Sequence, residues 1–273
     1  NYIKTIDRPL PEFSLYACEG LQVQIKVEND DYEKYVISYN DGSLNDTVTP
    51  FSTTTKVYSN NTVKTISVLG FYENFDCTNS DAKTIIPIIS LEEPQLKELV
   101  LTENNSQKNA SLSFNTNTLL EYYYEQKPPS LSFQIIDSIQ PTTTEITLPF
   151  NNLIASPYCY RISSFDRCGN SIQSKEICTI ELVTTATNNQ NTLIWNDYEV
   201  SAELEKYTIT KDKGNIATTS VANYTDIDVH CGTTYCYQVI AELNYNNSVT
   251  GAAVKSISQT SCIEAISSDI PPM

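Results

Sequence analysis

A tripeptide that occurs twice, Tyr-Cys-Tyr, is the feature of this sequence that most constrains its fold. It stands at 158–160 and again at 235–237, an offset of 77 residues. Each copy is followed by a strand-like segment, a polar turn and a further cysteine, which is Cys178 in the first copy and Cys262 in the second. Self-similarity of this kind indicates one small module repeated in tandem. We therefore expect β-domains in a row whose hairpins are closed by disulfides.

Alternating apolar and polar residues predict an all-β chain. Residues 21–28 read Leu-Gln-Val-Gln-Ile-Lys-Val-Glu, and this period of two is typical of a strand with one buried face. Short strands separated by turns indicate β-sandwiches. We expect three tandem immunoglobulin-like/fibronectin type III-like β-sandwiches. The other main expected strands cover 34–39, 62–71, 110–114, 120–125, 131–136, 145–148, 158–164, 192–195, 206–210, 235–243 and 252–257.

Two segments, 89–94 and 184–188, are expected to be the boundaries between modules. The module length that results is close to the ~100 residues of an immunoglobulin-like sandwich. The expected modules are 1–90, 91–183 and 184–268, and 269–273 is expected to be a linker to a missing C-terminal region. Because the chain starts at Asn1 without a signal peptide, we expect it to be a fragment of a longer exported protein.

The charge balance argues against nucleic acid and anionic membranes as partners. The formal net charge is −16, and arginine occurs only at positions 8, 161 and 167. Phosphate contacts need clustered lysine and arginine side chains. No run of ~18 apolar residues is present, so no membrane-spanning helix is expected.

Eight cysteines and a single histidine favour disulfides over a metal site. The sequence has no Cys-x-x-Cys motif, and the usual cysteine and histidine spacings of zinc sites are absent. We expect no metal and no cofactor. Disulfides persist in oxidising compartments, so the protein is expected to be exported, at the cell surface or outside the cell.

The repeat also predicts which cysteines pair. A hairpin turn centred on residues 168–169 places Cys159 opposite Cys178, close enough for a disulfide after a small twist. The second copy places Cys236 and Cys262 in equivalent positions.

In the first module the only cysteines are Cys18 and Cys77, and we expect them to pair. The partners of Cys168 and Cys231 stay open. One alternative pairs Cys231 with Cys262 and leaves Cys236 free.

Tyr158 and Tyr235 stand where a sandwich carries a tyrosine corner, at the entry to its sixth strand. The phenol of such a residue hydrogen-bonds the backbone a few residues upstream. Because the first module has no such tripeptide, we expect it to be a different sandwich.

Catalysis is not expected. A Ser-His or Cys-His site would have to use His230, which stands in a predicted turn. The three tyrosines at 122–124 could stack on a sugar, although a strand turns at least one of them into the core. The turns at 40–42 and 226–228 could bind calcium, but turn-forming aspartate is the simpler interpretation.

Several segments resemble modules of large surface proteins of Bacteroidota. Residues 158–171, Tyr-Cys-Tyr-Arg-Ile-Ser-Ser-Phe-Asp-Arg-Cys-Gly-Asn-Ser, resemble fibronectin type III-like modules, as do residues 192–196 with Trp195 in the place of a core tryptophan. Residues 35–43 and 17–20 of the first module resemble PKD-like domains. This series of modules is similar to gliding-motility-associated proteins exported by the type IX secretion system.

The resemblance implies further properties. Asp-(Ser/Thr)-apolar sequences accept O-glycans in this group, which makes Thr47 and Ser138 possible glycosylation sites. The group's partner is the outer-membrane secretion machinery, and surface glycans or other adhesin subunits are further possible partners.

The expected function is a non-catalytic stalk or adhesin-like region of a secreted cell-surface protein, a cargo of type IX secretion linked to gliding motility or attachment. One alternative is a carbohydrate-binding accessory region of a secreted hydrolase. Another is a partner subunit of the secretion translocon.

Overall fold

The computed structural model describes residues 9–72, 75–104, 107–115, 120–128, 131–140, 142–150, 157–198, 200, 203–247 and 250–267. The regular secondary structure of these residues consists of β-strands. Among them, no helix has the length and apolar character that crossing a membrane requires. The fold class is all-β, as the alternating sequence predicts.

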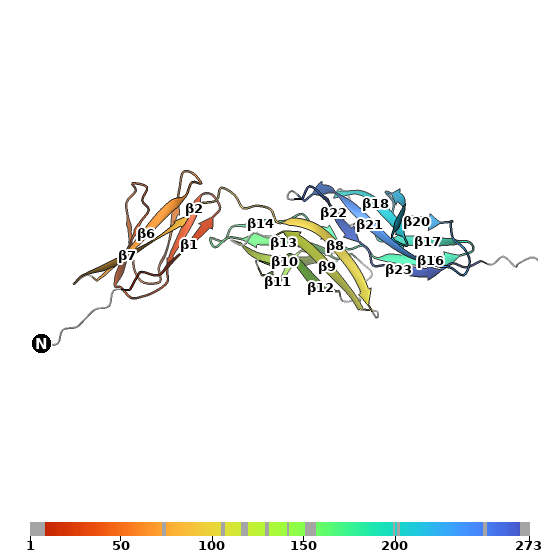
Figure 1. Ribbon diagram of the computed structural model, residues 1–273, viewed down its shortest axis with the longest axis horizontal. Coiled ribbons are helices and arrows are strands. Elements are labelled where there is room, and N and C mark those ends of the chain that lie inside the picture. Colours follow the sequence, from red (N-terminus) through yellow and green to blue (C-terminus); the bar gives the residue numbers. More distant parts are fainter. Residues whose placement is uncertain are drawn as a thin grey trace, which may run out of the picture. The chain divides into compact units, whose positions relative to one another are not determined.

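The strands follow one another closely along the chain (Figure 1). Their bounds are β1 Phe13–Cys18, β2 Gln22–Val27, β3 Lys34–Ser38, β4 Asp46–Val48, β5 Thr53–Val57, β6 Lys64–Tyr72, β7 Phe75–Ile85, β8 Gln95–Asn104, β9 Gln107–Asn115, β10 Glu121–Lys127, β11 Gln134–Ile139, β12 Glu145–Phe150, β13 Cys159–Phe165, β14 Ser171–Gln173, β15 Ile177–Cys178, β16 Leu182–Thr187, β17 Gln190–Trp195, β18 Leu204–Lys211, β19 Gly214–Thr219, β20 Asn223–Asp226, β21 Thr234–Asn246, β22 Ala253–Ile257 and β23 Ser261–Glu264.

The chain forms two compact units. Unit 1 contains residues 1–92 together with the hairpin tip 165–172, and unit 2 contains 93–164 and 173–273. The boundary expected near residue 90 lies close to the end of the first segment of unit 1. The boundary expected at 183–184 lies inside unit 2, within β16.

The first sandwich, β1 to β7, is built from two antiparallel sheets. One sheet has the order β1-β2-β5 and the other the order β4-β3-β6-β7. Alternate residues of β2 and β3 face inward, where Ile25, Tyr35 and Ile37 are fully buried in a common core with Ile66 and Val68 of β6. Burial of these apolar side chains between the sheets is the main stabilising contribution.

Unit 2 holds a second sandwich, β8 to β15, and a third, β16 to β23. The second has one sheet in the order β11-β10-β13-β14 and another in the order β12-β9-β8. The third repeats this plan with β16-β17-β20 and β19-β18-β21-β22. Strands β8 and β22 pair in parallel, so two of these sheets merge into one sheet of eight strands.

All three sandwiches have the same strand order, which is typical of fibronectin type III-like modules. A buried tyrosine occupies the same place on the third strand of each, Tyr35, Tyr122 and Tyr207. Their partners across the hairpin are Val48, Ile139 and Thr219. The first module therefore shares the strand order of the other two, although it lacks the Tyr-Cys-Tyr tripeptide.

Candidate functional sites

Two disulfides close the sixth-to-seventh-strand hairpins, as the sequence register predicts. Cys159 pairs with Cys178 and Cys236 pairs with Cys262, and each pair stands directly opposed across an antiparallel ladder. Cys231 is a free, exposed thiol, so the alternative pairing of Cys231 with Cys262 is wrong.

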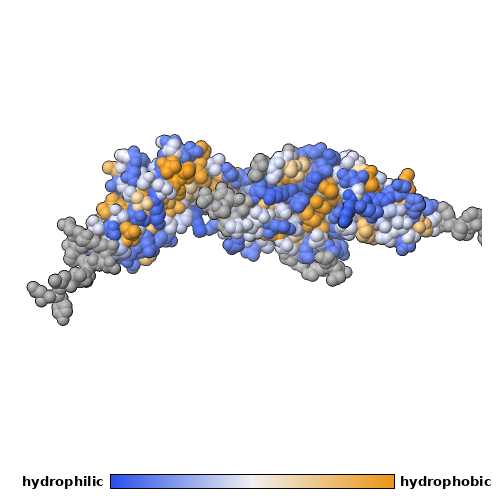
Figure 2. Space-filling view, viewed as in Figure 1, coloured by the Kyte–Doolittle hydropathy of each residue, from blue (hydrophilic) through white to orange (hydrophobic). Residues whose placement is uncertain are grey.

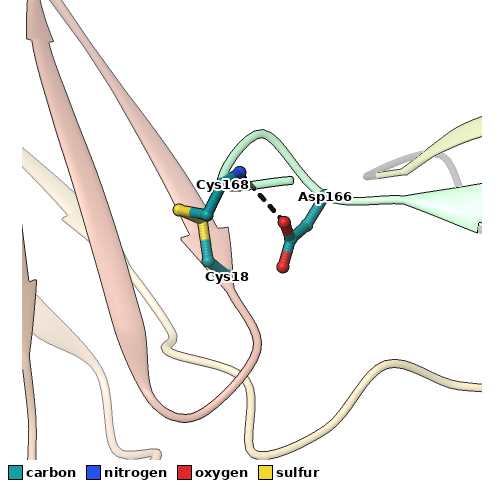
Figure 3. Close-up of side chains that lie close together, drawn as sticks. All are labelled: Cys18, Asp166 and Cys168. Carbon is teal, nitrogen blue, oxygen red and sulfur yellow. Dashed lines mark hydrogen bonds between the residues drawn. A yellow bond between two sulfur atoms is a disulfide. The ribbon is translucent and has the colours of Figure 1, made fainter. Parts of the chain in front are cut away.

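The pairing expected for Cys18 is also wrong. Cys18 is bonded to Cys168, 150 residues further along the chain, with the two Cα atoms 5.9 Å apart (Figure 3). Both cysteines belong to unit 1, because the tip 165–172 is part of that unit. Cys77 lies in β7, and its side chain falls outside the described residues.

Asp166 fixes the backbone around this disulfide. One carboxylate oxygen accepts from the backbone N–H groups of Cys168 and Asn170, and the other accepts from the N–H of Glu19, each at 2.9 Å (Figure 3 draws the first). Burial raises the pKa of Asp166, but the hydrogen bonds outweigh it and hold that pKa below its ordinary value. Cys18, Cys168 and Asp166 lie close enough together to hold a metal ion, but the two sulfur atoms are bonded to each other in the disulfide.

The tyrosine corner is present at Tyr235. Its hydroxyl accepts a hydrogen bond of 3.0 Å from the N–H of His230, five residues upstream. The ring nitrogen Nδ1 of the same histidine lies 3.3 Å from that hydroxyl. The backbone N–H of Tyr158 donates to Thr179, while residues 151–156, upstream of Tyr158, fall outside the described residues. The histidine that a catalytic triad would require is thus engaged with a structural tyrosine.

A buried polar network lies beside that corner in the third sandwich. The Lys211 ammonium lies 2.9 Å from Oδ2 of Asp226, which also accepts from the Tyr237 hydroxyl at 2.7 Å. Asn191 donates to the Tyr237 hydroxyl at 3.0 Å, and the N–H of Asp228 donates to Oδ1 of Asp226 at 3.0 Å. The carboxylate considered for calcium at 226–228 therefore has a lysine as its counter-charge.

In the turn at 40–42 of unit 1, the aspartate likewise accepts from a backbone N–H and has a lysine as its counter-charge. Asp41 accepts from the N–H of Ser43 at 2.9 Å, and its other oxygen lies 3.3 Å from the ammonium of Lys56. These hydrogen bonds from Ser43, with a smaller contribution from Lys56, lower the pKa of Asp41 to about 2. Both turns considered for calcium are thus stabilised internally.

We expect acid to destabilise the protein between about pH 4 and pH 2. The lowered pKa values of Asp41, Asp166 and Asp226 mean that the folded state holds these groups charged more strongly than the unfolded chain does. Their contribution is complete above the unfolded pKa of about 3.9 and is lost as the pH falls through the folded values. Thermal melts from pH 7 to pH 2 measure this, and Asp226→Asn should flatten the decline. A melting temperature constant down to pH 2 would contradict it.

A second buried carboxylate binds an arginine in the second sandwich. Glu125 is 6% exposed, and its Oε2 accepts from Nε and Nη2 of Arg161 at 2.9 and 2.6 Å. Ser163 donates to the other oxygen, and the guanidinium lies over the ring of Phe133. This arginine therefore has its charge neutralised within the module.

The three tyrosines at 122–124 do not share one face. Tyr122 is buried, whereas Tyr123 and Tyr124 are half-buried on β10. Figure 2 shows apolar surface, in orange, gathered in patches on both units and bordered by hydrophilic residues. A flat aromatic platform is therefore not formed by this segment.

The two possible glycosylation sites occupy equivalent positions. Thr47 lies in β4 and Ser138 in β11, each an exposed residue on the edge strand of its sheet. Thr47 stands opposite Val36, which follows the buried Tyr35. Ser138 stands opposite Tyr123, which follows the buried Tyr122. Thr47 and Ser138 remain predicted attachment sites, and both residues are exposed.

The junction inside unit 2 is the site that the sequence did not reveal. Three residue pairs, Lys255–Glu98, Ser256–Leu99 and Ile257–Val100, join the second and third sandwiches in parallel. The only nearby signal is the Asn246-Asn247 pair, which reads as a turn. Asn247 is in fact 1% exposed.

Side chains of the third sandwich tie it to backbone of the second. Asn247 donates to the carbonyl of Leu96 at 2.7 Å, and Ser256 donates to the carbonyl of Cys178 at 2.6 Å. Tyr245 donates to the carbonyl of Glu176 at 2.9 Å. Because these groups are mostly buried, each lost bond leaves a polar atom unsatisfied.

The side-chain amide of Gln259 pairs with the backbone of the segment that connects the second and third sandwiches, as the backbone of a neighbouring strand would. Its side-chain amide donates to the carbonyl of Leu182 at 2.7 Å and accepts from the N–H of the same residue at 3.2 Å. Leu182 begins β16 directly after the second sandwich. The link between the modules is therefore ordered.

A surface cavity of about 250 Å³ adjoins this junction. It is smaller than the ~300–1,000 Å³ of most ligand pockets. Its charged lining is engaged internally, because Glu93 accepts from the N–H of Lys175 and the Lys175 ammonium pairs with Glu203. The other lining residues are Pro94, Gln95, Leu96, Tyr245, Asn247 and Val254.

No protein-family model matches the chain. No curated protein matches it either. Among solved structures, it is similar to the central fibronectin-III array of a RIM-binding protein, with 10% identity over 66% of this chain and 71% of that chain and a TM-score of 0.27. So distant a likeness carries no argument about function, and the fold assignment above rests on the strand order.

Proposed function

We propose that this chain is a non-catalytic, stalk-like or adhesin-like part of an exported cell-surface protein. The observation that carries the proposal is the eight-stranded sheet of unit 2, which makes two sandwiches one continuous body. A spacer benefits from such a junction because it removes the flexible linker that usually separates modules.

The disulfides support an exported location. Three bridges are present in the described residues, and bridges of this kind persist in oxidising compartments. The resemblance of residues 158–171 to modules of Bacteroidota surface proteins supports type IX secretion as the route and gliding motility or attachment as the setting. The secretion machinery of the outer membrane would then be a transient partner.

A glycan array probed with the whole chain tests the stalk proposal. A stalk gives no saturable signal, whereas tight binding to one polysaccharide would favour a carbohydrate-binding accessory region. Export is tested separately, by surface protease treatment of cells with and without the type IX translocon. Stable co-purification with the translocon would instead favour a subunit of that machine.

We expect Asn247→Ala to uncouple the two sandwiches of unit 2. The substitution removes the bond to the Leu96 carbonyl and the acceptor for the N–H of Thr250, and should cost about 2 kcal/mol of unfolding free energy. Calorimetry should show an additional transition, and the fluorescence of Trp195 should report the third sandwich alone. The exposed residue Asn215 provides the control, because Asn215→Ala should leave the melting profile unchanged. A profile for Asn247→Ala that matches the control would refute the coupling.

A further inference from the structure

Edge strands are a hazard for a chain made of open sheets. Their outward N–H and C=O groups can pair with a strand of another molecule. Strand β7 ends the order β4-β3-β6-β7 in unit 1, and β11 begins the order β11-β10-β13-β14 in unit 2. These two strands have eleven and six residues, long enough to accept a partner.

Three amides on these two strands are hydrogen-bonded by the side chain of the preceding residue. Oδ1 of Asn79 accepts from the N–H of Ser80, and Oδ1 of Asp81 accepts from the N–H of Ala82, both at 2.9 Å. On β11, Oδ1 of Asp137 accepts from the N–H of Ser138 at 2.7 Å.

The register and the side-chain bonds together place the amides of Ser80 and Ala82 on the outer side of β7. In an antiparallel pair, every second residue exchanges both backbone bonds with its partner, and the N–H groups of the residues between point away. Ser80 and Ala82 are two residues apart, opposite Leu69 and Ser67 of β6, so their N–H groups point to the same side. Because their hydrogens are taken by side chains, that side is the one away from β6.

We propose that Asn79, Asp81 and Asp137 are edge caps, which close β7 and β11 to strand addition by a second copy of the chain. Each cap occupies the hydrogen that an incoming carbonyl would need. Asp81 and Asp137 also place a negative charge at the edge, which repels a second copy of a chain whose net charge is −16.

Other edges carry different protective features. Strand β4 has only three residues, β5 carries Lys56, and β12 contains Pro149, which has no N–H. Short length, lysine and proline are all known to discourage edge pairing. The caps therefore add to features of this kind in both units.

Hydrogen exchange tests the caps within the intact protein. After correction for intrinsic rates, we expect the amides of Ser80, Ala82 and Ser138 to exchange roughly three- to tenfold more slowly than that of Thr84. Thr84 lies on the same side of β7 as Ser80 and Ala82, but its preceding residue is Lys83, which has no acceptor. Equal rates at Thr84 and the three capped amides would overturn the proposal.

Three substitutions of Asp81 separate hydrogen bonding from charge. Asp81→Asn keeps the acceptor and should keep the slow exchange of Ala82. Asp81→Glu keeps the charge but lengthens the side chain, and should accelerate that exchange, as Asp81→Ala should. Exchange that follows the charge rather than the acceptor would overturn the cap.

Sedimentation velocity at increasing concentration tests the protective role. The triple variant Asn79→Ala, Asp81→Ala, Asp137→Ala should associate at concentrations where the unaltered chain does not. The control Asp30→Ala, Glu92→Ala removes the same charge from exposed residues outside the strands. If the triple variant sediments like this control, the caps do not prevent association and the proposal fails.

Discussion

Replacing both Cys18 and Cys168 by serine is expected to cause the largest loss of stability among removals of the three bridges in the described residues. The bridge spans 150 residues, whereas the hairpin bridges span 19 and 26. In the chain-entropy model, a loop of that length contributes about 5 kcal/mol, and a 19-residue hairpin contributes about 3 kcal/mol. The expected result is earlier unfolding of unit 1, which holds both cysteines.

Denaturant unfolding followed by circular dichroism measures this difference. Cys159→Ser with Cys178→Ser is the matched pair, and Cys231→Ser removes a sulfur that forms no bridge. The Cys231 variant should stay within about 0.5 kcal/mol of the parent chain. The assignment fails if removing the long-range bridge costs no more than removing the hairpin bridge.

Replacing Lys211 by methionine is the second substitution with a large expected effect. The side chains of Lys211 and Asp226 are 13% and 4% exposed, so the change leaves a carboxylate buried without its counter-charge. Removing one partner of a buried pair costs about 3–5 kcal/mol. Unfolding followed by the fluorescence of Trp195, which lies in the same sandwich, reports the loss.

Strand β18 supplies a matched control for this substitution. Lys206 lies on the same strand and pairs with Glu242 at 3.2 Å, but its side chain is 40% exposed. Lys206→Met should cost under about 1 kcal/mol because exposed ion pairs contribute little. Adding Asp226→Asn to Lys211→Met should restore part of the stability. Equal losses for the two lysine variants would contradict the role given to the buried pair.

Local features of the fold could be predicted from the sequence because they repeat with a fixed period. The alternation in residues 21–28 placed β2, and the register of a single hairpin placed Cys159 opposite Cys178. The corner at Tyr235 followed from its place beside the second cysteine motif. Each of these inferences needed only residues that are close together along the chain.

Long-range contacts could not be predicted in the same way. Cys18 and Cys168 meet because the tip 165–172 folds into unit 1, and no periodicity connects positions so far apart. The parallel pair β8–β22 was missed for the same reason, since nothing in either strand specifies a partner in another module. Asn247 does open the turn between β21 and β22, but its burial depends on the β8–β22 pairing and could not be predicted.

Two of the disulfides determine which strands carry tension along the chain. Strand β8 lies inside the covalent loop that Cys18–Cys168 closes, and β22 lies inside the loop that Cys236–Cys262 closes. The shortest covalent path between the two ends of the chain therefore runs through both bridges and contains neither strand. Tension follows this path, so the bonds that join Glu98–Val100 to Lys255–Ile257 are shielded from it while both bridges are closed.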